Sequence, residues 1–175
     1  MRNFIWEIRQ NPGIKSKLVV LLYRLATLHT KHNIIFYPVT FCFVILNKII
    51  NEVIIGVEIP YQTRIGKCFR IWHAHAIVIN KDCIIGDFFN IRQSCTLGAN
   101  KKSYPDRFVI GNNVTMGAHS CILGDDIIIG DNVIIGAGVI LMENIPAGHY
   151  VIGTKPIVKK IRKILKNGGL KNDFC

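Results

Sequence analysis

Two histidines, His73 and His75, are the side chains of this chain best suited to accept a proton near neutral pH. A carboxylate beside such a ring fixes its tautomer and stabilises its protonated form, as a general base requires. Glu58 precedes His73 by fifteen residues. The two side chains are therefore a candidate proton-transfer pair, provided that the chain between them folds back by about one full turn.

A six-residue repeat indicates how the chain folds back. This period fits neither the 3.6 residues of an amphipathic helix nor the alternation of a strand, but it suits a chain that turns a corner every six residues. Three such sides, about eighteen residues, make one coil of a parallel β-helix, which brings Glu58 to nearly the same side as His73. The repeated aliphatic anchors are Ile59, Ile65, Ile71, Ile79, Ile85, Ile91, Leu97, Ile110, Met116, Leu123, Ile129, Ile135 and Leu141.

The interruptions of the repeat are as informative as the repeat. Two extra residues separate Ile71 from Ile79, within residues 72–76, and a longer insertion covers residues 99–109. Irregular segments held by a rigid scaffold often carry binding and catalysis, so we predict the functional site there. A slip of one residue is expected between Met116 and Leu123. Eight anchors are followed by glycine, which predicts tight corners that would strain other residues.

The chain divides into three predicted regions. Residues 1–56 are expected to be helical, residues 57–155 form the β-helix, and residues 156–175 are a basic C-terminal tail or helix, which is also consistent with a merely solvated tail. The stretch 33–55 is strongly apolar, but Pro38 and the polar residues after Leu46 interrupt it. This favours a helix packed on the β-helix over a membrane span and leaves peripheral membrane attachment open.

Composition limits the class of protein. With 175 residues, half of them apolar, the chain is neither disordered nor fibrous, and one main domain is expected. The net charge of +11 permits an anionic partner without choosing one. The six cysteines form no CxxC pair or His/Cys cluster, so we expect small reduced core residues, no disulfide framework and no metal site. Together with an N-terminus unlike a secretion signal, this predicts a cytoplasmic protein.

An ordered set of motifs then resembles a known family. The set comprises Glu58-Ile59-Pro60, Arg64-Ile65-Gly66, His73-Ala74, Ile77-Val78-Ile79, Gln93-Ser94-Cys95-Thr96-Leu97-Gly98, Asp106-Arg107, Ile135-Gly136-Ala137-Gly138 and Gly153-Thr154-Lys155-Pro156. Over about Tyr23 to Lys159 it resembles the serine acetyltransferase branch of the hexapeptide acyltransferases. The run Ala76 to Lys81 and the short N-terminal region look closest to the colanic acid type of polysaccharide acetyltransferase.

The resemblance implies an all-β fold built on a left-handed parallel β-helix, a homotrimer with active sites between subunits, and direct transfer of acetyl from acetyl-CoA to a hydroxyl. His73 falls on the family's general base, and Glu58 falls on its supporting aspartate. Gly136, Ala137 and Gly138, with Gly98, would lie along the pantetheine arm, although β-helix corners need small residues anyway. Lys155, Lys159 and Lys160 would meet the CoA phosphates.

The acceptor is expected to be a sugar hydroxyl of a surface polysaccharide or its precursor, with serine as the alternative. Trp72 replaces an acidic residue that helps hold the serine ammonium, and an indole can stack on a sugar. Phe108 replaces a second histidine of the acceptor site. Other residues assigned to the acceptor are His75, in a supporting or structural role, Gln93, Asp106 and Arg107. Gln93 and Asp106-Arg107 still match serine acetyltransferases, and Arg107 would suit the carboxylate of serine or of an acidic sugar.

A non-enzymatic β-helix scaffold, with its basic tail on a membrane or nucleic acid, is a weaker alternative. It would bind no CoA and would associate with anionic polymers in a salt-dependent way. The register breaks at both candidate substrate segments argue against it. We therefore expect an enzyme with no nucleic-acid partner.

Overall fold

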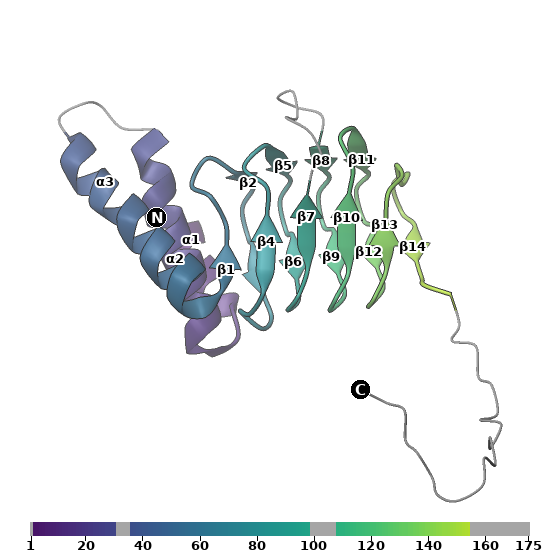
Figure 1. Cartoon of the computed structure of the whole chain (residues 1–175), viewed down its shortest axis with the longest axis horizontal. Helices are drawn as coiled ribbons and strands as arrows, with labels where there is room; N and C mark the ends of the chain where they lie inside the picture. The colour runs from purple at the N-terminus through teal and green to yellow at the C-terminus, as the bar shows by residue number, and fades with distance from the viewer. Residues whose placement is uncertain (1, 31–35, 99–107, 155–175) are drawn as a thin grey trace, which may run out of the picture.

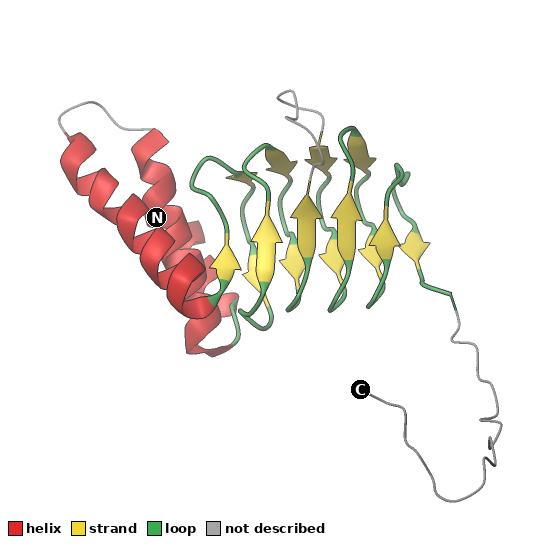
Figure 2. Ribbon diagram, in the orientation of Figure 1, coloured by secondary structure: helices red, strands yellow, loops and turns green. Residues whose placement is uncertain are grey.

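The computed structural model describes residues 2–30, 36–98 and 108–154, in which a set of helices precedes a three-sided β-helix (Figures 1 and 2). The helical elements are α1 (Arg2–Gln10), α2 (Gly13–Thr27), η1 (Leu28–Thr30), α3 (Tyr37–Leu46) and η3 (Asn47–Ile55). Helix α3 runs directly into the π-helical η3, and Gly56, with φ of 76°, ends it in the left-handed conformation. Residues 156–175, the predicted basic extension, lie outside the described residues, and the three-region division stays a prediction.

Short parallel strands make the prism. They are β1 (Val57–Glu58), β2 (Arg64–Ile65), β3 (Arg70–Ile71), β4 (Ile77–Ile79), β5 (Cys83–Ile85), β6 (Asn90–Ile91), β7 (Thr96–Gly98), β8 (Phe108–Ile110), β9 (Thr115–Met116), β10 (Cys121–Leu123), β11 (Ile127–Ile129), β12 (Ile134–Ile135), β13 (Ile140–Leu141) and β14 (Tyr150–Val151). Sheet A is β1-β4-β7-β10-β13, sheet B is β11-β8-β5-β2, and sheet C is β14-β12-β9-β6-β3. The predicted parallel β-helix is therefore confirmed.

The anchors of the repeat form the core of the prism. Ile71, Ile79, Ile91 and Leu97 are fully buried, and strands such as β4 and β5 alternate inward residues with outward ones. The slip expected before Leu123 is misplaced, because Ile122 is the buried residue that pairs with Leu97. The extra residue instead follows β10, between Ile122 and Ile127.

The glycines after the anchors have a different cause from the one expected. A Cβ at Gly66 would lie 2.3 Å from Asp87 Oδ1 and 2.6 Å from the carbonyl carbon of Gly86 in the next coil. Close approach between coils therefore excludes a side chain there, whereas the left-handed backbone at the corners is adopted by residues such as Ala76 and Ser94. This conformation recurs at two corners of the coil, at Cys68, Phe88, Asn113 and Asn132 and at Ala76, Ser94, His119 and Gly138.

The helices close the open edge of the first coil. A β-sheet edge exposes unpaired backbone groups, and side chains of the helices supply partners for them here. Glu7 Oε1 accepts a hydrogen bond from Phe69 N at 2.7 Å, and Asn11 Oδ1 accepts one from Ile71 N at 2.8 Å. Asn11 Nδ2 also donates to Phe69 O at 3.0 Å. These side chains take the place of a preceding coil along β3.

Helix α2 extends this closure with buried polar contacts. Tyr23 is fully buried and donates to Thr63 O at 2.6 Å, while Arg24 donates to Ile65 O at 2.8 Å and also to Gly66 O. Arg24 forms an ion pair with Glu7 at 2.7 Å. The first coil is therefore fixed by a hydrogen-bonded helical cap, defined here as α1, α2, α3 and η3.

Candidate active site

The two extra residues predicted near His73 form a bulge at one corner of the prism. This corner, between sheets C and A, holds three residues in later coils (92–94, 117–119 and 136–138) and five in the first coil (72–76). Ala74 is buried, whereas His73 and His75 are exposed on either side of it. The bulge therefore presents two imidazoles to solvent on an otherwise regular wall.

Glu58 lies on the outer face of sheet A, beyond the bulge. It pairs with Val78 in β4, so the first coil spans twenty residues from Glu58 rather than the expected eighteen or so. The bulge supplies the difference, and it leaves His73 at the corner that precedes β4. Among the contacts of the described residues, no hydrogen bond or ion pair joins Glu58 to His73, and their pairing stays a prediction.

A shallow hollow of about 300 Å³ on sheet A contains Glu58 and Gly98. Its volume is at the lower end of the range for small-ligand pockets. Gly98 ends β7, and residues 99–107, which follow it, lie outside the described residues. Phe108 and Val109, predicted to belong to the insertion, are part of β8 instead. Asp106 and Arg107, predicted to bind the acceptor, lie outside the described residues. The lining residues are Glu58, Pro60, Val78, Ile79, Asn80, Lys81, Leu97 and Gly98.

Trp72, next to His73, is flanked by two arginines that the sequence reasoning missed. The guanidinium carbons of Arg70 and Arg92 lie 5.6 and 5.2 Å from the centroid of the Trp72 ring. Such distances are those of cation–π contacts. The register of the repeat could have revealed both arginines. Arg70 and Trp72 lie on either side of the anchor Ile71, and Arg92 occupies the position of Trp72 one coil later. The corner is thus an aromatic and cationic surface.

His75 and Gln93 lie in the stacked column beside the bulge. The carbonyl of His75 accepts from Ser94 N at 3.0 Å, and the carbonyl of Gln93 accepts from His119 N at 3.1 Å. The Gln93 side-chain oxygen is buried and has no hydrogen-bond partner within the described part of the chain. The structure therefore brings His73, His75, Gln93 and Trp72 to one corner.

The glycines predicted to contact CoA are not all in one place. Gly98 ends a sheet A strand, whereas Gly136, Ala137 and Gly138 form the corner that precedes β13, at the opposite end of that sheet's strands. Gly138 has φ of 70°, and a Cβ at Gly136 would lie 3.0 Å from Val151 O, so the corner itself needs these small residues. Lys155, Lys159 and Lys160 lie outside the described residues.

Phe108 belongs to the core rather than to the surface of the site. It begins β8, is 1% exposed, and pairs with Cys83 and Ile127 in sheet B. Phe108 therefore adds no aromatic surface to the candidate site.

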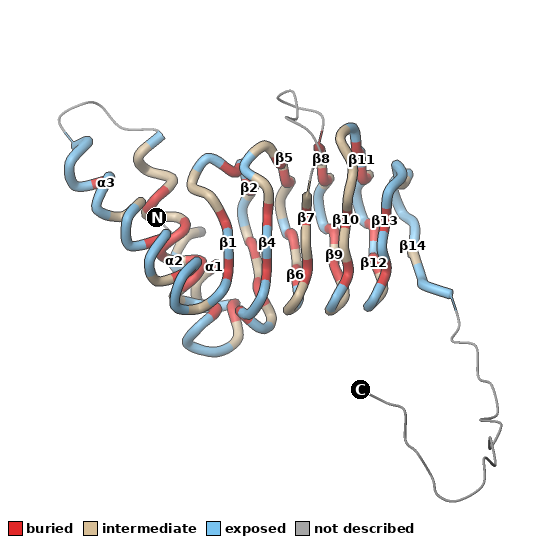
Figure 3. Tube along the Cα trace, viewed as in Figure 1, coloured by how far each residue is buried: buried red, intermediate tan, exposed pale blue. Residues whose placement is uncertain are grey.

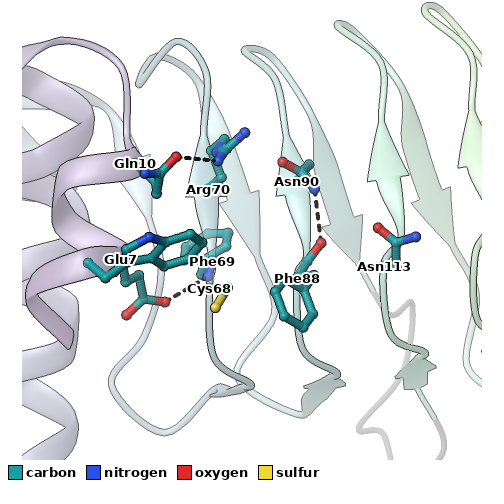
Figure 4. A pocket seen from close by; sticks show the side chains of 9 residues that line it. Glu7, Gln10, Cys68, Phe69, Arg70, Phe88, Asn90 and Asn113 are labelled. Atoms are coloured by element: carbon teal, nitrogen blue, oxygen red, sulfur yellow. Dashed lines mark hydrogen bonds between the residues drawn. The ribbon is translucent and has the colours of Figure 1, made fainter. Parts of the chain in front are cut away.

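A second cavity, of about 140 Å³, lies between α1 and the first coils, and Arg70 is among its lining residues (Figure 4). Polar groups that line it form hydrogen bonds between the helical cap and the first coil. Glu7 accepts one from Phe69 N, and Arg70 donates one to Gln10 at 3.1 Å. The cavity is a packing seam between the cap and the prism. Neither hollow holds a metal cluster, since no group of three His, Cys, Asp or Glu side chains gathers anywhere in the described residues.

The cysteines only partly match the expected core role. Cys83 and Cys95 are buried, and burial raises the pKa of the Cys83 thiol to about 12. Burial also raises the pKa of Cys68, which is half-buried. Cys42, however, is exposed on α3, and Cys175 lies outside the described residues. The prediction of core cysteines is therefore wrong for Cys42, because α3 turns its apolar side outward.

Comparison with known proteins agrees with this geometry. No protein-family model matches the chain. WcaB of Escherichia coli (strain K12), provisionally named a colanic acid biosynthesis acetyltransferase, is 38% identical over 163 residues, which are 89% of this chain and 98% of WcaB. The serine acetyltransferase of Synechococcus elongatus is 37% identical over 105 residues, which are 59% of this chain and 43% of that enzyme.

Solved structures give the same fold. Serine acetyltransferase isoform 3 of Entamoeba histolytica, in complex with cysteine, superimposes with a TM-score of 0.69 at 27% identity, covering 87% of this chain and 52% of that one. For the Brucella abortus serine acetyltransferase in complex with coenzyme A, the TM-score is 0.71 at 21% identity, covering 88% and 65%. The chain thus spans about half to two thirds of these two structures.

These findings define an acyltransferase of the hexapeptide-repeat, serine acetyltransferase-like branch. Within that branch the chain belongs to the family of the acetyltransferase WcaB. It is therefore an enzyme, and the reaction that its family supports is O-acetylation.

Proposed function

We propose that the chain transfers acetyl from acetyl-CoA to a sugar hydroxyl of a surface polysaccharide or of its precursor, with His73 as general base. The observation that carries this proposal is the bulge, in which His73 is exposed to solvent. The family resemblance supports the role of this residue as the general base. The name of the WcaB relative, with which the chain shares nearly its full length, supports a saccharide acceptor.

The proposed chemistry requires one proton to be moved twice. His73 accepts the proton of the acceptor hydroxyl as the oxygen attacks the thioester carbonyl. The protonated imidazole then returns that proton to the departing thiolate. Glu58 would stabilise the imidazolium if it turned toward the corner, and the family's thioester would supply the activated acetyl group. Histidine is suited to this exchange because its side chain can both accept and donate a proton near neutral pH.

The charge at the corner favours an acidic saccharide. The guanidinium groups of Arg70 and Arg92 both lie against the Trp72 ring, so a sugar bound beside this ring would meet two positive charges. Guanidinium groups bind carboxylates and phosphates strongly. We therefore infer that the acceptor carries a uronate or a phosphate-linked sugar. A serine ammonium would be repelled by the same two arginines.

We further propose a homotrimer built from left-handed coils, in the cytoplasm. The family resemblance supports the trimer, as does the separation of Gly98 from Gly136–Gly138 within one subunit. Ile140 and Met142 on the last coils are exposed apolar side chains, which suits a contact between copies. The handedness is supported by the course of the strands, which rise in front and descend behind as the chain advances (Figure 1). Lys155, Lys159 and Lys160 are proposed to meet the CoA phosphates.

Serine O-acetylation is the second candidate, because serine acetyltransferases are among the relatives and structural neighbours. Incubation of the protein with acetyl-CoA and either L-serine or oligosaccharides with and without uronate separates the two. The account predicts release of free thiol with the acidic oligosaccharide and little with serine. Turnover with serine alone would refute the saccharide proposal.

A further inference from the structure

The outer surface of the helical cap is apolar where its inner surface is polar. In α3 and η3 the polar residues Thr40, Asn47 and Asn51 are buried, the last only 1% exposed, whereas Val53 is 74% exposed. Figure 3 shows α3 as largely exposed on the side of the cap away from the prism. The outward side chains, called the apolar ridge below, are Tyr37, Val39, Phe41, Ile45, Leu46, Ile49, Val53 and Ile54.

This inverted pattern is opposite to that of a surface helix of a soluble protein, whose apolar stripe faces the core. The inward amide groups donate hydrogen bonds: Asn47 Nδ2 donates to Ile59 O at 3.1 Å, and Asn51 Nδ2 donates to Val19 O at 3.1 Å. The buried Oδ1 of Asn51 accepts no hydrogen bond within the described residues. The helix is thus fixed in this orientation, and rotation cannot bury the ridge. Contiguous exposed apolar surface of this kind marks contact with a membrane or a protein.

We propose that the apolar ridge docks on the surface of an anionic lipid bilayer, with α3 and η3 lying in the plane of the interface. Tyr37 and Phe41 suit the headgroup boundary, where amphipathic and aromatic rings are favoured. Segment Tyr37–Ile55, of 19 residues, is long and apolar enough to cross a membrane by composition, and 17% of its most apolar window is buried. Interfacial helices combine such an apolar face with flanking basic residues.

Charge favours a bilayer over a second copy of the chain. Within residues 1–56 there are two acidic residues, Glu7 and Glu52, and Glu7 is buried against Arg24. Two cationic caps facing each other would repel, whereas anionic headgroups would attract both. The basic residues of this region are Arg2, Arg9, Lys15, Lys17, Arg24, Lys31 and Lys48.

The same contacts argue against a spanning helix. Crossing the bilayer would break the hydrogen bonds of Asn47 and Asn51 to the cap and the first coil. It would also carry Lys48 and Glu52 into hydrocarbon, which is costly. Docking flat preserves every one of these contacts and still buries the ridge.

The surface lies at the end of the prism that carries the bulge. β1 follows η3 directly, and His73 belongs to the first coil against which the cap packs (Figure 1). A docked enzyme would therefore hold its candidate base close to the headgroups. This extension, which rests on the proposed function, assigns a lipid-linked saccharide as the acceptor.

Vesicle flotation tests the docking directly. The wild-type chain should float with vesicles of phosphatidylcholine containing about one third phosphatidylglycerol and bind pure phosphatidylcholine less. The variant Val39→Gln/Ile45→Gln/Val53→Gln changes exposed positions only and should lower binding by at least about tenfold. The matched control Ile128→Gln/Ile134→Gln/Tyr150→Gln removes exposed apolar groups from the prism and should bind as the wild type does.

Three outcomes would overturn the proposal. Wild-type protein that does not float, or a ridge variant that floats equally well, excludes docking through this surface. Sedimentation that shows the ridge variant breaking a larger assembly assigns the ridge to a second copy, and protein that resists alkaline carbonate extraction spans the bilayer. CoA binding by the ridge variant, measured in parallel, separates these failures from failure of the acetyltransferase function, since CoA binding should be unchanged.

Discussion

The first coil of the prism and the three coils after it share one corner but build it differently. In the later coils this corner stacks three residues on the corner before, whereas the first coil has five, among them His73 and Ala74. The first coil has no preceding coil to match and is closed instead by the helical cap through Glu7, Asn11 and Arg24. Because no coil precedes it, the first coil does not have to match another coil on that side. This is the coil that contains the two-residue insertion, in which the candidate base is exposed. A regular wall and a reactive corner thus arise from the same repeat.

Removal of the His73 imidazole is the strongest test of the difference between the first coil and the later ones. We expect His73→Ala to lower kcat by about 10²–10⁴, because general-base catalysis contributes that much. His119→Asn changes a histidine of the same corner two coils later, at a left-handed position that Asn tolerates, and should leave kcat unchanged. Rates of thiol release with saturating acetyl-CoA measure both variants. Equal rates for wild type and His73→Ala would remove His73 from the mechanism.

The first coil also differs from the later coils because it packs against the helical cap. Glu7→Gln leaves Arg24 partly buried without its charge partner, and breaking a buried pair in this way costs about 3–5 kcal/mol of unfolding free energy. Glu52→Gln, on the exposed side of η3, should change it by less than about 0.5 kcal/mol. Urea unfolding followed by circular dichroism measures the difference. A loss below about 1 kcal/mol for Glu7→Gln would show that the cap does not depend on this pair.

The cationic surface around Trp72 spans the first coil and the second. Arg70→Leu/Arg92→Leu should raise KM for an acidic saccharide by about 10- to 100-fold, since a hydrogen bond to a charged group is worth about 1.5–3 kcal/mol. KM for acetyl-CoA and for a neutral saccharide should stay the same. Steady-state kinetics with matched acidic and neutral oligosaccharides distinguishes these effects, and a uniform rise in every KM would indicate a distorted corner instead.

The smallest expected effect concerns Tyr23, which ties α2 to Thr63 in the first coil. Tyr23→Phe should lower the unfolding free energy by about 1 kcal/mol at neutral pH. Burial raises the pKa of Tyr23 to about 12, so the unfolded chain ionises first and the wild type loses stability as pH rises from about 10 toward 12. Urea unfolding at pH 9 and pH 11 should show a smaller loss in the Phe variant. An equal loss in both would assign the alkaline sensitivity to other groups.

The sequence predicted the prism because a six-residue apolar period has few other structural solutions. It also located the bulge, since an insertion in a stacked repeat is visible as a break in spacing. It could not place Glu58 relative to His73, because the insertion lengthens the first coil, so that Glu58 pairs with Val78, twenty residues later. The sequence also could not predict the orientation of α3 and η3, because an apolar run does not indicate which face turns inward. Asn47 and Asn51 fix this orientation through hydrogen bonds to residues outside the helix.

A crystal structure of the protein with bound CoA would test the central claim most directly. The account predicts that copies of the chain meet around the site and that the CoA sulfur contacts the imidazole of His73 at the corner of the first coil. A sulfur bound beside the regular corners of the later coils, away from His73, would contradict it.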